Sequence, residues 1–250
     1  MMELVDVTKT YQQGQRAVLA VRGVSMTVCE GEFVSIMGPS GSGKSTLMHL
    51  LGALDTPTSG KALFRGQDLN AMSDRDRSQL RRTRIGFVFQ FFNLLPTLRA
   101  VENVALPLLL GGWSRAKALK QSAAALDRVG LSHRAEHFSD EMSGGEMQRV
   151  AIARALVTEP DAVVCDEPTG NLDSANSKEI LTLLRCLPES GRRSVVMVTH
   201  DPVAAQYGDR IIHIRDGLIE STEELRSDED RARVIRDHGS GIRGQGSPVR

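Results

Sequence analysis

Hydrophobic positions change their spacing three times along this chain. In the first 90 residues, short apolar runs alternate with polar turns, which is typical of strands. The predicted strands are Leu4–Val7, Val24–Val28, Phe33–Met37, Lys61–Phe64 and Ile85–Phe89. One helix is expected among them, at Thr46–Leu51. The pattern in residues 1–90 therefore predicts half of an α/β core built around one helix.

Helical spacing replaces the strand pattern from about Phe91 to Glu159. Within Ser114–Gly130, Ala118, Ala125, Leu126 and Val129 recur at the interval of one helix face. A second helical run follows at Glu146–Val157. The sequence therefore predicts a helical subdomain, residues 91–159, inserted into the α/β core.

Strands return in the last third of the chain, at Ala162–Cys165, Ser194–Val198 and Ile211–Ile214. Continuous apolar strands are typical of a parallel sheet that is covered on both faces. The predicted fold class is α/β, with residues 1–90 and 160–220 forming the core of one domain that spans residues 1–220. Residues 221–250 are first densely charged and then rich in Gly and Ser, which predicts a weak helix followed by a flexible tail.

A glycine-rich segment joins the third predicted strand to the first predicted helix. It fits the pattern GxxxxGK[ST], which binds phosphate through backbone N–H groups and a helix N-terminus. We expect the Lys44 ammonium to reach the β- and γ-phosphates of a nucleotide, and the Ser45 hydroxyl to bind Mg²⁺. The candidate nucleotide-binding residues here are Gly38, Pro39, Ser40, Gly41, Ser42, Gly43, Lys44, Ser45 and Thr46.

Two carboxylates end the strand Ala162–Cys165. The carboxyl ends of parallel strands are where α/β sheets bind ligands. We expect Asp166 to hold Mg²⁺ and Glu167 to polarise the water that attacks the γ-phosphate. Without the phosphate loop upstream, a solvated acidic turn would explain these residues equally well.

A second candidate anion site precedes the helical run Glu146–Val157. Ser143, Gly144 and Gly145 lie just before this helix, and helix N-termini attract anions. The segment from Glu141 to Leu156 resembles the signature segment of ABC-type ATPases, with Met142 where Leu is usual and Glu146 where Gln or Glu is common. One chain binds one nucleotide and therefore one γ-phosphate, so a second anion-binding terminus needs another explanation. The resemblance implies that this terminus closes on ATP held by another subunit, forming a homodimer. An ordinary glycine-containing helix cap is the alternative.

The resemblance assigns roles to four more residues. It implies that Tyr11 stacks on adenine, Gln90 contacts Mg²⁺ and the attacking water, His200 contacts the γ-phosphate, and Asp173 belongs to a loop that crosses the dimer. Each has a plainer alternative. A tyrosine in an edge strand can simply pack, a strand-end amide can be inert, a lone histidine is usually unremarkable, and an aspartate can cap the next helix.

Nearly the whole chain to about Glu220 resembles the lipoprotein-release and macrolide-export branch of this family. The resemblance rests on Gly52–Gly60, Phe91–Leu98, Val101–Leu108 and Asp166–Asp173. It implies a P-loop NTPase core with an N-terminal antiparallel β subdomain, ATP and Mg²⁺ as cofactors, and an integral-membrane permease docking near Phe91–Leu98. Apolar packing between the lobes is the alternative for that segment.

Two other functions remain open at this point. A cell-division relative of this branch signals through its permease and need not move cargo. A non-transport ABC ATPase of DNA repair or translation would be indicated by a fused second nucleotide domain or a long insertion, and the sequence has neither.

Composition narrows the possible partners and the compartment. The formal net charge is zero, so no basic field favours nucleic acid as a partner. Cys29, Cys165 and Cys186 lie in apolar surroundings, which predicts free buried thiols in a reducing compartment. The N-terminus lacks a basic segment and an apolar signal core. We therefore expect a cytoplasmic protein, peripheral on the cytoplasmic face of the inner or plasma membrane.

Overall fold

Two β-sheets and a set of helices make up the structure, a computed structural model that describes residues 1–14, 16–191 and 193–225. The smaller sheet is antiparallel throughout, with strand order β2-β1-β4-β5. Its strands are β1 (Met2–Gln13), β2 (Arg16–Val28), β4 (Ser59–Phe64) and β5 (Gln67–Asp68).

The larger sheet has six strands in the order β10-β9-β3-β8-β7-β6. All neighbouring pairs are parallel except β9 and β10, which form an antiparallel hairpin at one edge. The predicted parallel core is therefore confirmed. Its strands are β3 (Phe33–Met37), β6 (Ile85–Phe89), β7 (Ala162–Asp166), β8 (Ser194–Thr199), β9 (Arg210–Arg215) and β10 (Leu218–Glu224).

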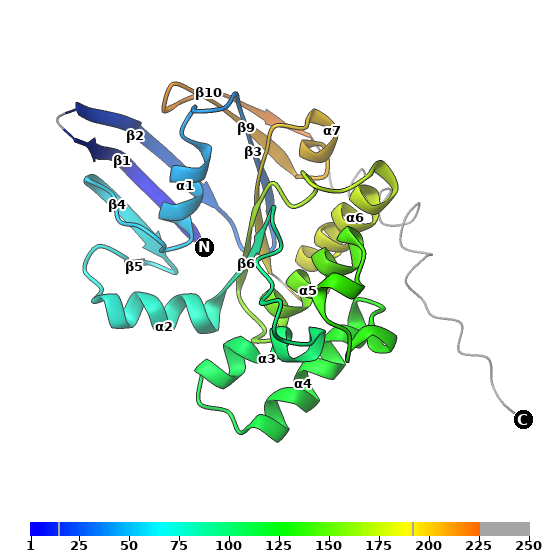
Figure 1. Ribbon diagram of the computed structural model, residues 1–250. Coiled ribbons are helices and arrows are strands. Elements are labelled where there is room, and N and C mark those ends of the chain that lie inside the picture. The colour runs from blue at the N-terminus through cyan, green and yellow to red at the C-terminus, as the bar shows by residue number, and fades with distance from the viewer. Residues whose placement is uncertain (15, 192, 226–250) are drawn as a thin grey trace, which may run out of the picture.

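Helices cover the larger sheet on both sides (Figure 1). Helix α1 (Lys44–Leu51) contacts strands of both sheets and lies between them. Helices α3 (Ala100–Leu110), α4 (Arg115–Arg128) and α5 (Gly144–Leu156) pack on one another, and α5 also packs on β6 and on α6 (Ser174–Gly191). The remaining elements are α2 (Asp74–Arg84), α7 (Pro202–Ala205) and 3₁₀ turns at Ser132–Arg134 and Ser139–Glu141.

Alternate residues of the parallel strands supply two separate cores. In β7 and β8, Val163 and Val195 belong to the core shared with α3–α6, while Val164 and Val196 belong to the core shared with α1 and the smaller sheet. Successive side chains of a strand point to opposite faces, so strands buried on both faces must be apolar throughout. This explains why the sequence showed continuous apolar runs there.

Helix α2 contradicts the expectation of one helix in residues 1–90. It has no buried residue, so its sequence lacks the apolar periodicity by which helices are recognised. Its start is nevertheless marked, because Ser73 Oγ accepts a hydrogen bond from the Asp76 N–H at 3.2 Å.

Four other expectations need correction. Strand β1 extends beyond Leu4–Val7 through polar residues that carry no hydrophobic signal, and β2 begins well before Val24, at Arg16, with an apolar stretch that includes the exposed Val18 and Leu19. Strand β1 lies between β2 and β4, so it is not an edge strand. Cys29 is exposed rather than buried, since it follows the last residue of β2. Strand β10 continues to Glu224, across the predicted boundary after residue 220, and the predicted tail beyond residue 225 lies outside the described residues.

Gly86 allows β6 and α5 to pack closely. A Cβ at this position would lie 2.5 Å from the backbone oxygen of Ala155. We expect Gly86→Ala to lower the free energy of unfolding by about 1–3 kcal/mol, because the strand or the helix must move to admit the methyl group. Urea unfolding followed by circular dichroism would measure this. An unchanged unfolding midpoint would contradict the close packing.

Candidate nucleotide site

The glycine-rich loop connects β3 to α1, as its sequence position predicted. Gly43 is the N-cap residue of α1 and has a φ of 102°, a conformation that favours glycine. The Lys44 side chain folds back over the loop, and its Nζ donates hydrogen bonds to the carbonyl oxygens of Gly38 and Pro39, both at 2.9 Å. The loop thus surrounds a positive charge at the N-terminus of a helix, a combination that attracts anions.

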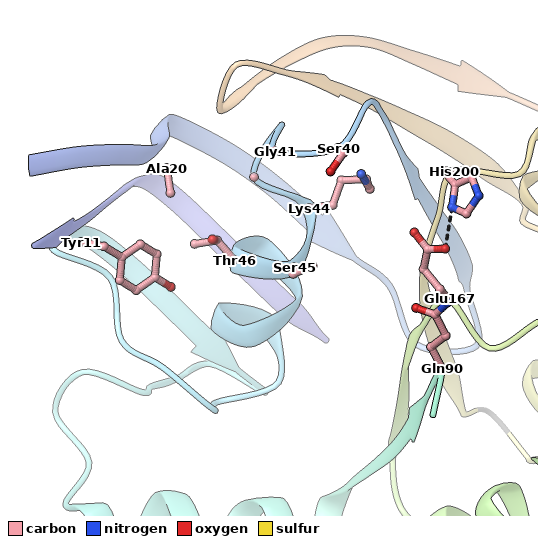
Figure 2. A pocket seen from close by; sticks show the side chains of 11 residues that line it. Tyr11, Ala20, Ser40, Gly41, Lys44, Ser45, Thr46, Gln90, Glu167 and His200 are labelled. Carbon is pink, nitrogen blue, oxygen red and sulfur yellow. Dashed lines mark ion pairs between the residues drawn. The ribbon is translucent and has the colours of Figure 1, made fainter. Parts of the chain in front are cut away.

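A cavity of about 660 Å³ opens beside this loop. In Figure 2, Lys44, Ser45 and Thr46 lie between Tyr11 on one side and Glu167 with His200 on the other. Three residues of the predicted loop set do not line the cavity: Gly38, Pro39 and Ser42, the last with its side chain buried. The lining residues are Tyr11, Ala20, Ser40, Gly41, Gly43, Lys44, Ser45, Thr46, Gln90, Glu167 and His200.

Glu167 and His200 form the far wall of the cavity. Glu167 Oε2 lies 2.5 Å from His200 Nδ1 (Figure 2). The Glu167 backbone has a φ of 45°, which is uncommon for a residue other than glycine, and it is held by a 2.9 Å hydrogen bond from its N–H to the Val198 oxygen. Strained backbone of this kind gathers at functional sites, where it fixes a side chain in one direction.

Asp166 ends β7 next to Glu167 but does not line the cavity. Burial raises the pKa of Asp166 above its ordinary value, and the neighbouring Glu167 charge adds to the effect. His49 and the Lys44 ammonium act on the pKa of Asp166 in the opposite direction. Lys44 is therefore close enough to Asp166 for the two charges to interact, and the loop and the strand end belong to one electrostatic site.

The oxygen donors at this end of the sheet suit Mg²⁺. Ser45 and Gln90 line the cavity with a hydroxyl and an amide, and the Asp166 carboxylate lies at the adjoining strand end. Mg²⁺ is usually bound in nucleotide sites by one or two protein oxygens, with water and phosphate completing the shell. Among the described residues, no group of three His, Cys, Asp or Glu side chains could hold a metal alone.

Tyr11 is held in position by two residues. Its hydroxyl donates a hydrogen bond to Asp55 Oδ2 at 3.0 Å, and Lys9 Nζ contacts Asp55 Oδ1 at 2.6 Å. The Lys9 ammonium also lies 5.1 Å from the centre of the tyrosine ring. Burial raises the pKa of Tyr11. The ring is therefore fixed at the cavity wall as a neutral aromatic surface.

Gln90 follows the last residue of β6 and is joined to the loop after β7. The Asn171 side-chain amide donates to the Gln90 carbonyl oxygen at 3.0 Å, and Gln90 Nε2 lies 3.4 Å from Asn171 Oδ1. Gly170 packs against the same glutamine side chain. Gln90 thus joins the cavity to the segment that carries Asp173.

Asp173 is the N-terminal cap of α6. Its carboxylate accepts hydrogen bonds from the Asn176 N–H at 2.9 Å and from the Asn176 side-chain amide at 2.7 Å. The first of these bonds is the main reason that the pKa of Asp173 is lowered. The capping alternative considered for this residue is therefore present in the structure, and its exposed side chain does not line the cavity.

The Ser143–Gly145 segment forms the N-terminus of α5. Ser143 Oγ accepts from the Glu146 N–H at 3.3 Å, and Glu146 Oε2 accepts from the Ser143 N–H at 2.8 Å, which is a capping box. At Gly145 a Cβ would lie 2.1 Å from Asn176 Oδ1, so a larger residue would require the Asn176 side chain to move. None of these residues lines the cavity of the same chain.

Three residues at these sites were missed by sequence reasoning. Ala20 lines the cavity, Asp55 orients Tyr11, and Arg134 contacts Glu146. Asp55 and Arg134 act through side chains distant in sequence, at separations of 44 and 12 residues. Alanine has no chemistry to mark it, and charged residues in turns are usually solvated, so none of the three carries a local signal in the sequence.

Comparison with known proteins identifies the family of this chain. The family profile described as "ABC transporter" matches residues 21–170. The chain belongs to the ABC transporter family. It is 51% identical to an uncharacterised ABC transporter ATP-binding protein of Thermotoga maritima, over 89% of this chain and 94% of that protein.

Two further relatives indicate the branch of the ABC family. The lipoprotein-releasing system ATP-binding protein LolD of Pseudomonas fluorescens is 47% identical, over 85% of this chain and 93% of its own length. The macrolide export ATP-binding/permease protein MacB of Syntrophobacter fumaroxidans is 49% identical over 88% of this chain. This chain spans only 31% of that longer protein.

A solved structure has the same fold. It is described as the dimeric structure of a post-hydrolysis state of the ATP-binding cassette MJ0796 bound to ADP and Pi. A protein of that name comes from Methanocaldococcus jannaschii. The structure covers 91% of this chain and all of its own chain, with 44% identity and a TM-score of 0.84.

These comparisons identify the protein as an ATP-binding and ATP-hydrolysing subunit of an ABC transporter, similar to LolD and MacB. Within the described part of the chain, no helix of this ABC ATPase is both long enough and apolar enough to span a membrane.

The Glu146 carboxylate gives this site a measurable dependence on acid. The Ser143 N–H and then Arg134 lower the pKa of Glu146 to about 2, from an ordinary value of 4.5. A depressed pKa in the folded state means that the carboxylate stabilises the fold above pH 4.5 and that this contribution is lost as the pH falls toward about 2. We expect the unfolding free energies of the unsubstituted protein and Glu146→Gln to differ by a constant amount above about pH 5 and to converge below pH 4.5. Urea titrations at several pH values would test this, and a difference that did not shrink in acid would contradict it.

Proposed function

We propose that this ABC ATPase works as a homodimer that closes around two ATP molecules and drives a permease of the lipoprotein-release or macrolide-export kind. One observation carries the proposal. The described part of each chain has two glycine-containing helix N-termini, at Gly43 and Ser143, and of these the first lines the chain's own cavity. A second copy can supply the other terminus to the exposed side of a bound nucleotide. The dimeric cassette MJ0796, bound to ADP and Pi, supports this assembly.

In this proposal, the residues on different walls of the cavity bind different parts of ATP. Tyr11 presents its ring to the adenine, while the loop N–H groups and Lys44 bind the phosphates. Glu167 orients and polarises the attacking water, and His200, which lies 2.5 Å from Glu167, holds that carboxylate and contacts the γ-phosphate. Phosphoryl transfer depends chiefly on positioning and charge stabilisation, so a lone subunit without the partner's Ser143–Gly145 should hydrolyse ATP slowly.

Mg²⁺ is part of the same proposal. Ser45, Asp166 and Gln90 would hold it, and it would neutralise the charge that develops on the phosphate oxygens. Asp173 lies at the start of α6, where its exposed carboxylate would face the partner subunit.

The segment Phe91–Leu98 is the proposed docking site for the permease. Side chains of two neighbouring helices hold its backbone through hydrogen bonds. Arg154 of α5 donates to the Phe92 oxygen at 2.7 Å, and the buried Asn103 donates to the Leu95 and Leu98 oxygens at 3.1 and 3.0 Å.

The side chains of this segment divide between the core and the surface. Leu94 packs against the core shared with α3–α6, so the packing alternative holds for this residue. Phe91 is 73% exposed and Leu95 is 47% exposed. A rigid loop that displays two large apolar side chains is typical of a partner surface. Docking to a permease would place the subunit on the cytoplasmic face of the membrane.

The dimer can be tested with Glu167→Gln, which keeps the shape of the side chain and removes its charge. Without an effective group to polarise water, ATP should stay bound and hold two subunits together. We expect light scattering to show the mass of one subunit without nucleotide and of two with Mg-ATP.

Lys44→Ala in the Glu167→Gln protein provides the control. Loss of the loop cation should weaken ATP binding, so this double variant should remain monomeric at the same Mg-ATP concentration. If the Glu167→Gln protein hydrolysed ATP as fast as the unsubstituted protein, Glu167 would not be the residue that polarises the attacking water. A monomer under all conditions would contradict the dimer.

The docking site can be tested with Phe91→Ser. This substitution removes an exposed side chain, so the fold and the ATP-induced dimer should be unchanged. Binding to membrane vesicles from the source organism, stripped of peripheral proteins, should fall at least about tenfold if Phe91 is an anchor. Leu110→Ser is a matched control, because Leu110 is 68% exposed at the end of α3. Equal loss of binding in both variants would contradict a specific role for Phe91–Leu98.

A further inference from the structure

At the N-terminus of helix α5, a carboxylate lies where a phosphate is proposed to bind. Glu146 lies in the first turn of α5, the same turn that would accept a partner's γ-phosphate. Its carboxylate caps the helix by accepting from the Ser143 N–H at 2.8 Å. A carboxylate beside a phosphate is repulsive, and the repulsion grows when the site is closed and water is excluded. The cap that orders this terminus therefore also opposes its ligand.

Arg134 resolves the conflict. Its Nε donates a hydrogen bond to Glu146 Oε1 at 2.8 Å, while Glu146 Oε2 stays on the Ser143 N–H. The two oxygens are thus divided between a cation and the helix cap. The Glu146 side chain is only 13% exposed and that of Arg134 33%, so water screens this pair less than a surface ion pair.

Arg134 is itself held in place from a second side. Its Nη1 lies 3.1 Å from His137 Nε2, and because a guanidinium can only donate, the imidazole nitrogen accepts. The His137 N–H donates to the Arg134 oxygen at 3.0 Å, and the His137 oxygen accepts from the Ala100 N–H at 2.8 Å, where α3 begins. The guanidinium is therefore pre-positioned by the helical layer.

We propose that Arg134 is a positioning residue for ATP hydrolysis. It neutralises the Glu146 carboxylate and holds it on the cap, so that Ser143, Gly144 and Gly145 can accept the γ-phosphate of ATP bound to a partner subunit. This inference rests on the proposed function, because it needs the nucleotide to lie between two subunits.

If the charge of Glu146 opposes phosphate binding, the effects of single and double substitutions on ATP-induced dimerisation should not add. Arg134→Ala leaves an unpaired carboxylate facing the phosphate and should weaken ATP-induced dimerisation by about tenfold or more. Glu146→Gln should change it by only about twofold, because glutamine can also close a capping box. The double variant Arg134→Ala/Glu146→Gln should recover most of the loss, since removing the carboxylate makes its neutralising partner unnecessary.

The measurement is light scattering against Mg-ATP concentration, with every variant made in the Glu167→Gln background. Binding of a fluorescent ATP analogue to the monomer is measured in parallel, and it should be unchanged because Arg134 does not line the cavity. Steady-state hydrolysis in the Glu167 background should show a lower kcat for Arg134→Ala, with recovery in the double variant.

Arg115→Ala is the matched control. Arg115 Nη2 contacts Glu102 Oε1 at 2.8 Å, and the other oxygen of Glu102 accepts from the Arg99 N–H at the start of α3. This ion pair therefore also joins an arginine to a capping glutamate, but at a helix end without the Ser-Gly-Gly segment. We expect no change in dimerisation for this variant.

The outcomes separate the two proposals. If the Glu167→Gln protein does not dimerise with Mg-ATP, the proposed function and this inference both fail. If it dimerises and Arg134→Ala dimerises equally well, only the inference fails. If Arg134→Ala loses dimerisation but Glu146→Gln does not restore it, Arg134 supports the fold of its segment and the charge argument is overturned.

Discussion

Burial of the parallel sheet on both faces is the constraint on which the rest of the structure depends. Because β7 and β8 give alternate side chains to two cores, neither face has room for polar chemistry. In these two strands the polar side chains therefore lie at the ends. Asp166, Glu167 and His200 follow this rule, as does the loop after β3. The chemistry of the site therefore gathers at one edge of the sheet, where backbone N–H groups and side chains from distant segments meet around a single cavity.

Helix α5 connects this edge to the surface proposed for the permease. Its first turn holds Ser143 and Glu146, its middle donates from Gln148 to the Pro168 oxygen at 2.6 Å, and Arg154 near its end holds the Phe92 oxygen. A helix is stiff along its axis, and each of these attachments is a hydrogen bond to fixed backbone. A displacement of Phe91–Leu98 would therefore be transmitted along α5 to the helix terminus that we propose accepts phosphate.

The sequence predicted the elements that have a strong local signal. Strands β3, β6, β7, β8 and β9 are short runs dominated by apolar residues, and the phosphate loop has a spacing that few other structures require. Helix α2 was missed because none of its residues is buried, so the hydrophobic pattern on which prediction depends does not exist there. The partners of site residues were missed for a different reason. Asp55 meets Tyr11 and Arg134 meets Glu146 only after the chain has folded, and no local pattern encodes such a pair.

In the proposed dimer, the division of the site between two helix termini explains why a carboxylate is tolerated in the first turn of α5. A terminus that bound its ligand permanently could be capped by any neutral group. One that must accept and release a phosphate in each cycle needs to stay ordered while it is empty, and the ionised Glu146, with its pKa near 2, provides a strong cap in that state. The cost is repulsion in the closed state, which Arg134 offsets at 2.8 Å. The pair thus stabilises the empty helix end without opposing closure, as reversible assembly around ATP requires.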